Sequence, residues 1–320
     1  MYRFASIGEA LIDFVPIKKG FYLKDVAQFE RVVGGAPANV ASAFAKLGGE
    51  SILLTKLGTD AFGDHIIEEL QKSGVNCRFI PRSKEHDTSL AFVSHTRDGR
   101  NDYNFYRRNA ADLSLTYEEV KGAIHSFELL HFCSVSLVES EMKQTHLQLI
   151  KDCKDKIISF DPNVRLALWD NPLQLKQTIL DFIPYANILK IADDELAFMM
   201  DTNDINEALE QLWNYPSLQC VVYTKGAKGA SIYTRNHQVH HPGFQVEVQD
   251  TTGAGDAFIG AFLWYIALRE QPPKDMDEEA LDKGLLFANA YAALSTKKAG
   301  AINAYVDVDE LAIFLEEYTD

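Results

Sequence analysis

The chain has 320 residues, of which 47% are hydrophobic, enough for the core of one large α/β domain or of two smaller ones. Its 46 acidic and 31 basic residues give a formal net charge of −15, which argues against a nucleic-acid or anionic-membrane surface. The N-terminal stretch has acids at Glu9 and Asp13 and no long apolar run, and no segment is long and apolar enough for a membrane span, so we expect a cytoplasmic protein.

Short apolar runs alternate with longer amphipathic segments along the chain. We predict strands at residues 4–11, 51–58, 127–133, 156–161, 187–192 and 220–226. Between them, segments such as 37–48 and 60–74 space their apolar residues for one face of a helix. This alternation predicts a single α/β domain over residues 1–320, with a doubly wound, mostly parallel sheet flanked by helices.

Two stretches, at about residues 13–33 and 88–107, fit this alternation poorly. Both alternate like strands, and the second has a turn signal at Asp98-Gly99. They are candidates for the arms of a small sheet that projects from the main domain as a lid or as an oligomer contact. A plain edge hairpin is the alternative.

Later in the chain, the glycine-rich turn TTGAG separates a strand-like segment at 244–250 from a helical segment at 257–270. Glycines let the backbone approach a ligand closely, and the free N–H groups of a helix start create an anion site. A tight turn capped by Asp256 is the alternative. There is no GxxxxGK[ST] loop, and the glycines at 253, 255 and 260 miss the GxGxxG spacing.

The acid at the end of this turn, Asp256, would repel a phosphate unless it takes a proton from the attacking hydroxyl. That arrangement is typical of phosphoryl transfer, which needs a base for the nucleophile and amides for the developing charge. Further candidates follow the ends of predicted strands, where open α/β sheets bind ligands. They are Asp161-Pro162-Asn163 with Arg165, Lys190 with residues 193–195 (for which a solvated helix cap is the alternative), and residues 224–226.

Two motifs, GGAPAN at 34–39 and DTTGAGD at 250–256, match the two signatures of a known family. With them, the sequence resembles the ribokinase-like (PfkB) family of sugar kinases over nearly its whole length. Within that family it is most similar to the fructokinases, on the stretches GEALIDFVP, LAFV, FYR, DPNVRLALW and KIADDE. The resemblance implies a ribokinase-like fold with a small β-sheet lid.

The resemblance also implies an activity, namely ATP-dependent phosphorylation of the 6-hydroxyl of fructose by direct in-line transfer. Asp256 would be the base, the amides of Gly253, Ala254 and Gly255 the anion hole, and Arg165 a partner of the transferring phosphate. The implied sugar contacts are Asp13, Gly34, Gly35, Asn39, Arg107 and Asp256. The implied nucleotide contacts are Lys190, Thr224, Gly226, Gly229, Gly253, Gly255 and Asn289.

Metal ions complete the set that the resemblance implies. Magnesium would bridge the phosphates, with Glu195 acting on it through water. A potassium ion beside the anion hole would use Asp250 and Thr252, with the backbone carbonyls of Ser295, Lys298 and Gly300. Two positions depart from the family pattern: Ala192 stands where an Asn is common, and Ala304 where a potassium-binding Ser is common, which weakens the potassium assignment.

The sequence leaves alternatives for the substrate and the assembly. A kinase of the same fold that acts on ribose, 2-keto-3-deoxygluconate or a nucleoside is the nearest rival. A sugar or nucleotide sensor without turnover is the remote one. A homodimer formed through the lid is expected from the resemblance.

Overall fold

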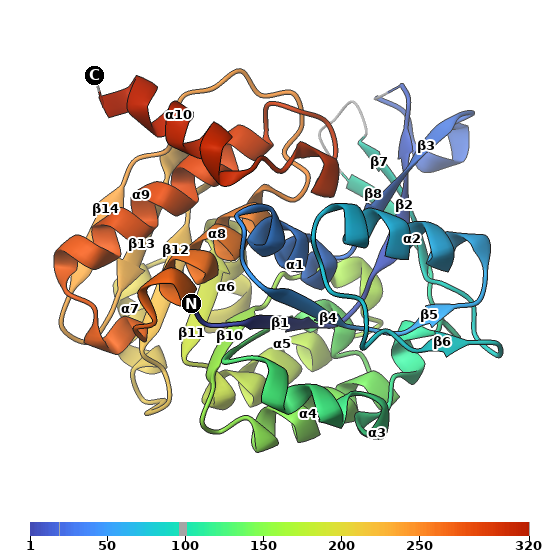
Figure 1. Cartoon of the computed structure of the whole chain (residues 1–320), viewed down its shortest axis with the longest axis horizontal. Helices are drawn as coiled ribbons and strands as arrows, with labels where there is room; N and C mark the ends of the chain where they lie inside the picture. Colours follow the sequence, from blue (N-terminus) through green and yellow to red (C-terminus); the bar gives the residue numbers. More distant parts are fainter. Residues whose placement is uncertain (19, 96–100, 320) are drawn as a thin grey trace.

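The computed structural model describes residues 1–18, 20–95 and 101–319 (Figure 1). The turn signal at Asp98-Gly99 lies outside the described residues. Within them, no helix combines the length and apolar character that crossing a bilayer requires.

An eight-stranded sheet runs through the centre of the molecule, in the order β14-β13-β12-β11-β10-β9-β1-β4. Its strands are β1 (Phe4–Ile7), β4 (Ser51–Leu54), β9 (Leu129–Cys133), β10 (Ile157–Asp161), β11 (Ile188–Ala192), β12 (Cys220–Thr224), β13 (Ala230–Tyr233) and β14 (Gln238–His241). The strands from β4 to β12 pair in parallel, and β13 and β14 are antiparallel. The mostly parallel sheet is therefore confirmed.

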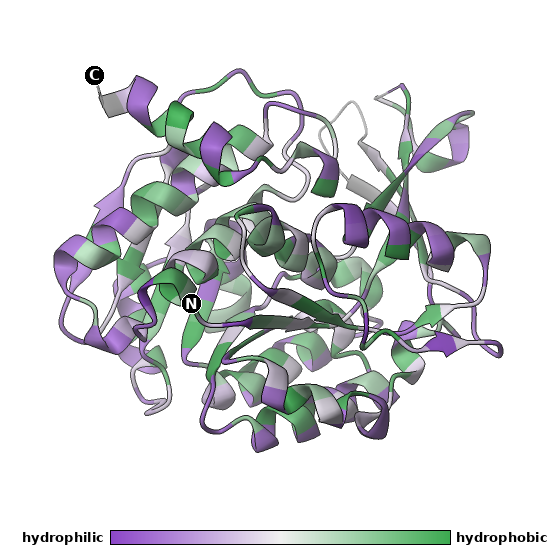
Figure 2. Ribbon diagram, viewed as in Figure 1, coloured by the Kyte–Doolittle hydropathy of each residue, from purple (hydrophilic) through white to green (hydrophobic). Residues whose placement is uncertain are grey.

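Helices cover both faces of this sheet, and each face has its own hydrophobic core (Figures 1 and 2). One core includes residues of α1 (Ala36–Lys46), α2 (Ala61–Lys72), α8 (Ala254–Arg269), α9 (Glu278–Ser295) and α10 (Val308–Thr319). The other includes residues of α3 (Tyr117–Val120), α4 (Glu141–Asp152), α5 (Pro172–Phe182), α6 (Asp193–Met200) and α7 (Ile205–Leu212). Residues 256–267 of α8 are all buried, because this helix packs against both α1 and α9.

A separate four-stranded sheet projects at one end of the molecule (Figure 1). Its order is β3 (Phe29–Gly34), β2 (Leu11–Pro16), β7 (Leu90–His95) and β8 (Asn101–Tyr106). Phe14, Phe29 and Phe92 pack together on it, with ring centroids 4.6 to 6.5 Å apart. We call this four-stranded sheet the small sheet. A two-stranded sheet, β5 (Leu57–Gly58) with β6 (Arg82–Ser83), lies beside it.

Three predicted strands differ in the structure. The strand predicted at 4–11 is divided: the backbone turns at Gly8, where φ is +146°, and β2 then enters the small sheet. The strand predicted at 51–58 ends at Leu54. Segment 244–250 pairs with no strand of the described chain, and its side chains Phe244, Val246 and Val248 line a largely apolar cavity.

Candidate active site

The start of α8 is the centre of the candidate site. Gly253 caps this helix with a left-handed backbone (φ +74°), and a Cβ there would lie 2.5 Å from the Ala301 Cβ. Only glycine fits such a conformation and such a close approach. The Ala254 N–H donates to the Thr251 carbonyl at 3.2 Å, and in the described part of the chain the Gly255 N–H has no such backbone acceptor. This N–H therefore remains available to an anion at the helix start.

A cavity of about 140 Å³ lies between this helix start and the small sheet. It brings together the predicted residues Asp13, Gly35, Asn39, Arg165 and Asp256. The small sheet contributes Leu11, Asp13 and Val15 of β2, Val93 of β7, and Tyr103 and Phe105 of β8. The main domain thus supplies polar side chains such as Asn39 and Asp256, and the small sheet supplies mostly apolar and aromatic side chains together with Asp13. We call this space the first cavity.

Asp256 is held in the first cavity by Asn39, one helical turn into α1. The Asn39 Nδ2 donates to the Asp256 Oδ2 at 2.8 Å, and both side chains are buried. Burial raises the pKa of the Asp256 carboxyl, while the Asn39 hydrogen bond and the charges of Lys190 and Arg165 oppose this rise. A carboxylate with a raised pKa is a stronger base, so the position suits proton abstraction.

Asp13 lies against Gly34, which explains the first glycine of the GG pair. A Cβ at Gly34 would stand 2.0 Å from the Asp13 Oδ2, although Gly34 itself does not line the first cavity. The second glycine, Gly35, has a φ of +105°, and a Cβ there would meet the Glu9 carbonyl at 2.5 Å. Burial, and next the Glu9 charge, raise the pKa of Asp13 to about 7.

Arg107 was expected to contact the sugar, but it is not among the residues that line the first cavity. Its Nε donates to the Asp112 Oδ2 at 2.7 Å, and its terminal nitrogens donate to the Val135 carbonyl at 2.7 Å and the Ser136 hydroxyl at 3.1 Å. Arg107 and Asp112 are both buried. The structure therefore indicates that Arg107 anchors the base of β8 to the main domain.

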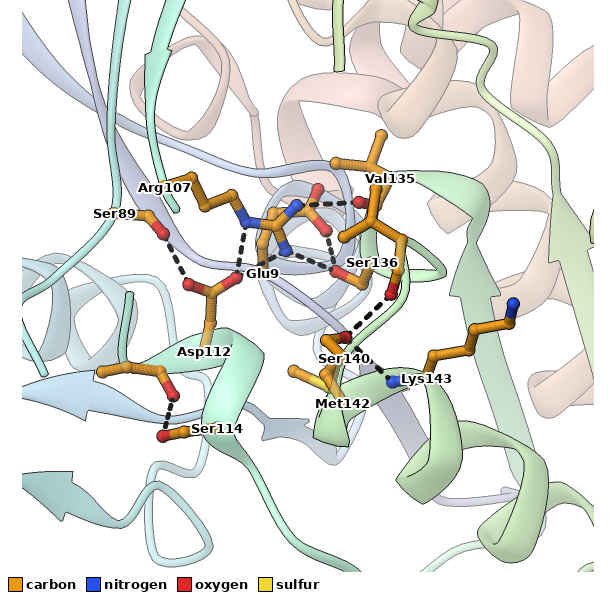
Figure 3. Close-up of polar contacts among 12 residues, drawn as sticks. Glu9, Ser89, Arg107, Asp112, Ser114, Val135, Ser136, Ser140, Met142 and Lys143 are labelled. Carbon is orange, nitrogen blue, oxygen red and sulfur yellow. Dashed lines mark hydrogen bonds and ion pairs between the residues drawn. The ribbon is translucent and has the colours of Figure 1, made fainter. Parts of the chain in front are cut away.

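Glu9 is a buried residue of the first cavity that we did not predict as a site residue. Its Oε1 accepts from the Ala36 N–H at 3.1 Å at the start of α1, and its Oε2 accepts from the Ser136 hydroxyl (Figure 3). Burial raises the pKa of Glu9, and the Arg107 charge opposes this. The signal was present in the GEALID stretch, but nothing in the sequence distinguishes a buried acid there from a loop acid.

Behind the start of α8, Lys190 forms a buried ion pair with Asp161, with 2.9 Å between Nζ and Oδ2. A Cβ at Gly255 would lie 3.4 Å from the Lys190 Nζ, so the ammonium group is close to the helix start. Burial opposes the charge of Lys190, yet Asp161 and Glu195 raise its pKa above the ordinary value. Lys190 does not line the first cavity, nor a second cavity that lies next to Asn289 on the other side of the helix start.

Glu195 is buried, whereas its neighbours Asp193 and Asp194 are exposed. One Glu195 oxygen accepts from the Val164 N–H at 2.6 Å and the other from the Ala192 N–H at 2.9 Å. Glu195 therefore caps α6 and ties it to the loop after β10. It is a buried cap, unlike the solvated cap that was the alternative prediction.

A second cavity, of about 240 Å³, lies on the other side of the turn at 251–256. The predicted nucleotide residues Thr224, Gly226, Gly229, Gly255 and Asn289 line it. Its walls also include the apolar side chains of Phe244, Val246, Val248 and Phe258. Thr252, Gly253 and Asp256 line the first cavity, while Thr251, Ala254 and Gly255 line the second. One short turn therefore separates the two spaces.

Three of the residues predicted for potassium, Asp250, Thr252 and Gly300, stabilise this turn through hydrogen bonds. The Asp250 Oδ1 accepts from the Thr252 N–H at 3.1 Å and from the Thr252 hydroxyl at 2.8 Å, and its Oδ2 accepts from the Gly300 N–H at 3.0 Å. The Ser295 hydroxyl donates to the Ala292 carbonyl, and the Lys298 ammonium lies 3.6 Å from Glu310 at the surface. Ala304 is buried and has no side-chain oxygen to offer a cation.

Comparisons with known proteins match this chain over nearly all its length. A family model described as pfkB family carbohydrate kinase matches residues 1–307. Fructokinase-2 from Zea mays is 40% identical over 304 residues, covering 93% of this chain and 90% of that protein. The crystal structure of a fructokinase with bound ATP from Xylella fastidiosa superimposes with a TM-score of 0.89 at 31% identity, covering 99% of both chains. A double-mutant fructokinase from Vibrio cholerae, with fructose, ADP and potassium ion bound, gives 0.87 at 30% identity over 98% of both chains.

Proposed function

The chain belongs to the pfkB family of carbohydrate kinases, and from this premise we propose that it transfers a phosphoryl group from ATP to the 6-hydroxyl of fructose. The observation that carries the proposal is the turn at 251–256, which separates the first cavity, with Asn39 and Asp256 in its lining, from a largely apolar second cavity. A sugar in the first cavity and a nucleotide in the second would meet at this turn. Fructokinases from a plant and from bacteria are among the similar proteins.

In the proposed reaction, Asp256 accepts the proton of the sugar hydroxyl as this oxygen attacks the terminal phosphorus. Asn39 keeps the carboxylate oriented toward the first cavity. The Gly255 N–H and the dipole of α8 stabilise the negative charge that develops on the transferring group. Arg165 is exposed at the rim of the first cavity and would pair with phosphate oxygens through its planar guanidinium.

The donor groups near the start of α8 fit a magnesium–nucleotide complex. Asp161 and Glu195 are buried carboxylates beside Lys190, and the Asp161 Oδ1 has no protein hydrogen-bond partner in the described chain. Magnesium, when bound with ATP, neutralises phosphate charge, and Glu195 would act on it through water. We also propose a potassium ion near Asp250 and Gly300, without a contribution from the side chain at position 304.

The small sheet would act as a lid over the sugar, because three of its strands line the first cavity. Exclusion of water by such a lid protects ATP from hydrolysis.

The small sheet also carries exposed aromatic side chains. Tyr106 on β8 is exposed beside Phe92, and Tyr22 near it is also exposed. We propose that small sheets of two copies pair through this surface in a homodimer. A mass of one chain by light scattering at micromolar concentration would contradict the dimer.

The test of the function is a substrate panel with the purified protein, ATP and magnesium, read by coupled ADP release. Fructose, ribose, 2-keto-3-deoxygluconate and a nucleoside are compared by kcat/KM, because pocket contacts with hydroxyl groups discriminate strongly within one fold. We expect fructose to give the highest value, with phosphate on the 6-hydroxyl by NMR. A higher value for another acceptor would reassign the substrate. No ADP release with any acceptor would contradict the kinase and favour a sensor.

A further inference from the structure

The Gly253 carbonyl, at the turn between the two cavities, accepts two hydrogen bonds. One comes from the Ala257 N–H at 2.8 Å, within α8. The other comes from the hydroxyl of Tyr305, 52 residues away in the chain, at 3.0 Å. No motif of the sequence singles out Tyr305. We propose that Tyr305 is a positioning residue for phosphoryl transfer, which fixes the first turn of α8 relative to the bound phosphate. This inference rests on the proposed kinase function.

Tyr305 is itself held in one place. Its side chain is buried, and its ring centroid lies 6.0 Å from that of Tyr291 on α9. It follows a 3-10 turn at Ile302–Ala304, and the preceding Ala301 packs on Gly253. A Cβ at Gly253 would meet the Tyr305 hydroxyl at 2.8 Å. The hydroxyl is therefore a fixed donor aimed at the helix cap.

The consequence for the site follows from the geometry of the first helical turn. The Gly253 carbonyl and the Ala257 N–H enclose residues 254–256, which carry the Gly255 N–H and the Asp256 carboxylate. Gly253 has a left-handed backbone, and because glycine can adopt many backbone conformations, this one depends on the contacts around it. Asn39 fixes the Asp256 side chain, and the Tyr305 hydroxyl fixes the backbone that bears it. Both restraints are needed for a preorganised anion site.

Tyr305→Phe tests the inference, because it removes the hydroxyl and keeps the ring. The Gly253 carbonyl retains its bond from Ala257, so no buried acceptor is left unpaired. Tyr291→Phe is the matched control, since the Tyr291 hydroxyl is also buried and donates to a carbonyl, that of Val306 at 3.0 Å, away from both cavities. Thermal unfolding should change about equally in the two variants.

We expect Tyr305→Phe to lower kcat about 3- to 10-fold, because a less well-fixed helix start should stabilise the transition state less, by about the free energy of one net hydrogen bond. KM for fructose and ATP should stay within about twofold. Binding of ADP with aluminium fluoride and sugar, which imitates the transition state, should weaken by the same factor, and ADP binding should not. Tyr291→Phe should keep kcat within about twofold of wild type. Equal kcat values for the two variants, lowered or not, would overturn the inference. A wild-type protein without kinase activity would instead overturn the proposed function.

Discussion

At the scale of single residues, Asp256 is the side chain on which the proposed chemistry depends. Asp256→Asn keeps the size of the side chain and an oxygen that can accept from Asn39, so the cavity should retain its shape. An amide cannot accept the proton of the sugar hydroxyl. We expect kcat to fall by a factor on the order of 10²–10⁴. Steady-state kinetics measure this fall, and calorimetry should show that sugar still binds. Turnover near the wild-type rate would contradict the assignment of Asp256 as the base.

Gly34 offers a second residue-scale test, because its missing side chain makes room for Asp13. In Gly34→Ala the new methyl would stand 2.0 Å from the Asp13 Oδ2, and the carboxylate is the group that must move. We expect KM for fructose to rise about 10- to 100-fold, the loss of one hydrogen bond to a charged group. KM for ATP should not change, since Asp13 and Gly34 lie outside the second cavity.

Gly122→Ala is the control for that substitution. Gly122 has no neighbouring atom within 4 Å of an added Cβ and has no positive φ. Its substitution should leave both KM values unchanged. An unchanged KM for fructose in Gly34→Ala would show that the position of Asp13 is unimportant for sugar binding.

At the scale of elements, Asp112 clamps the start of β7 to the end of β8, which lie side by side in this antiparallel pair. Ser89, directly before β7, donates to the Asp112 Oδ1 at 2.5 Å, and Arg107, directly after β8, donates to the Oδ2 at 2.7 Å (Figure 3). Asp112→Asn would leave the buried Arg107 charge without its ionic partner. We expect the free energy of unfolding to fall by about 3–5 kcal/mol, as for other broken buried ion pairs.

Urea denaturation followed by circular dichroism measures the effect of Asp112→Asn. Glu279→Gln serves for comparison, because it breaks an exposed ion pair with Lys283 on the surface of α9. The exposed pair should contribute little. If both variants unfold at the same urea concentration, the clamp is not a stabilising feature of the small sheet.

The same elements show what the sequence can and cannot predict. Short apolar runs located six of the eight strands of the main sheet, because a buried strand needs a continuous run of apolar residues, and they did not predict β13 and β14. The strand-like stretches at 13–33 and 88–107 predicted the small sheet, but the start of β2 at Leu11 was assigned to the strand predicted at 4–11. Segment 244–250 alternates equally well and pairs with no described strand. The GGAPAN and DTTGAGD motifs predicted the family, and the family model confirms it.

The residues of the candidate site were also predictable only in part. Asp13, Asn39 and Asp256 were predicted from motifs and converge on the first cavity. The surroundings of Arg107 were not predictable, because its bonds to Val135 and Ser136 join positions 28 and 29 residues apart in the chain. Tyr305 was not predicted for the same reason, because its partner Gly253 lies 52 residues away in the chain. A local motif identifies a turn, whereas the groups that hold the turn come from distant segments.

At the scale of the whole molecule, the site concentrates acids in a protein that already carries a net charge of −15. Burial raises the pKa values of Glu9, Asp13, Asp161 and Asp256, to about 7 for Asp13 and Asp161. A folded pKa above the unfolded value means that the native state binds more protons than the unfolded state. Burying these carboxyl groups together therefore lowers the free energy of unfolding at pH values where they ionise.

The sign of the pH dependence follows for Asp13. Its contribution to stability is fully present below the unfolded pKa of about 4 and is lost as the pH rises through about 7. Between these values one such group lowers the free energy of unfolding by up to about 1.4 kcal/mol per pH unit. Without ligands, the urea midpoint should therefore be lower at pH 8 than at pH 5.

Asp13→Asn separates this effect from the other acids, because an amide does not titrate. The variant should lose less stability between pH 5 and pH 8 than the wild type and be the more stable of the two at pH 8. Asp194→Asn, which changes an exposed acid, should keep the wild-type slope. Parallel slopes for Asp13→Asn and the wild type would mean that Asp13 is ionised at both pH values. The sugar would then meet a carboxylate in the first cavity throughout this range.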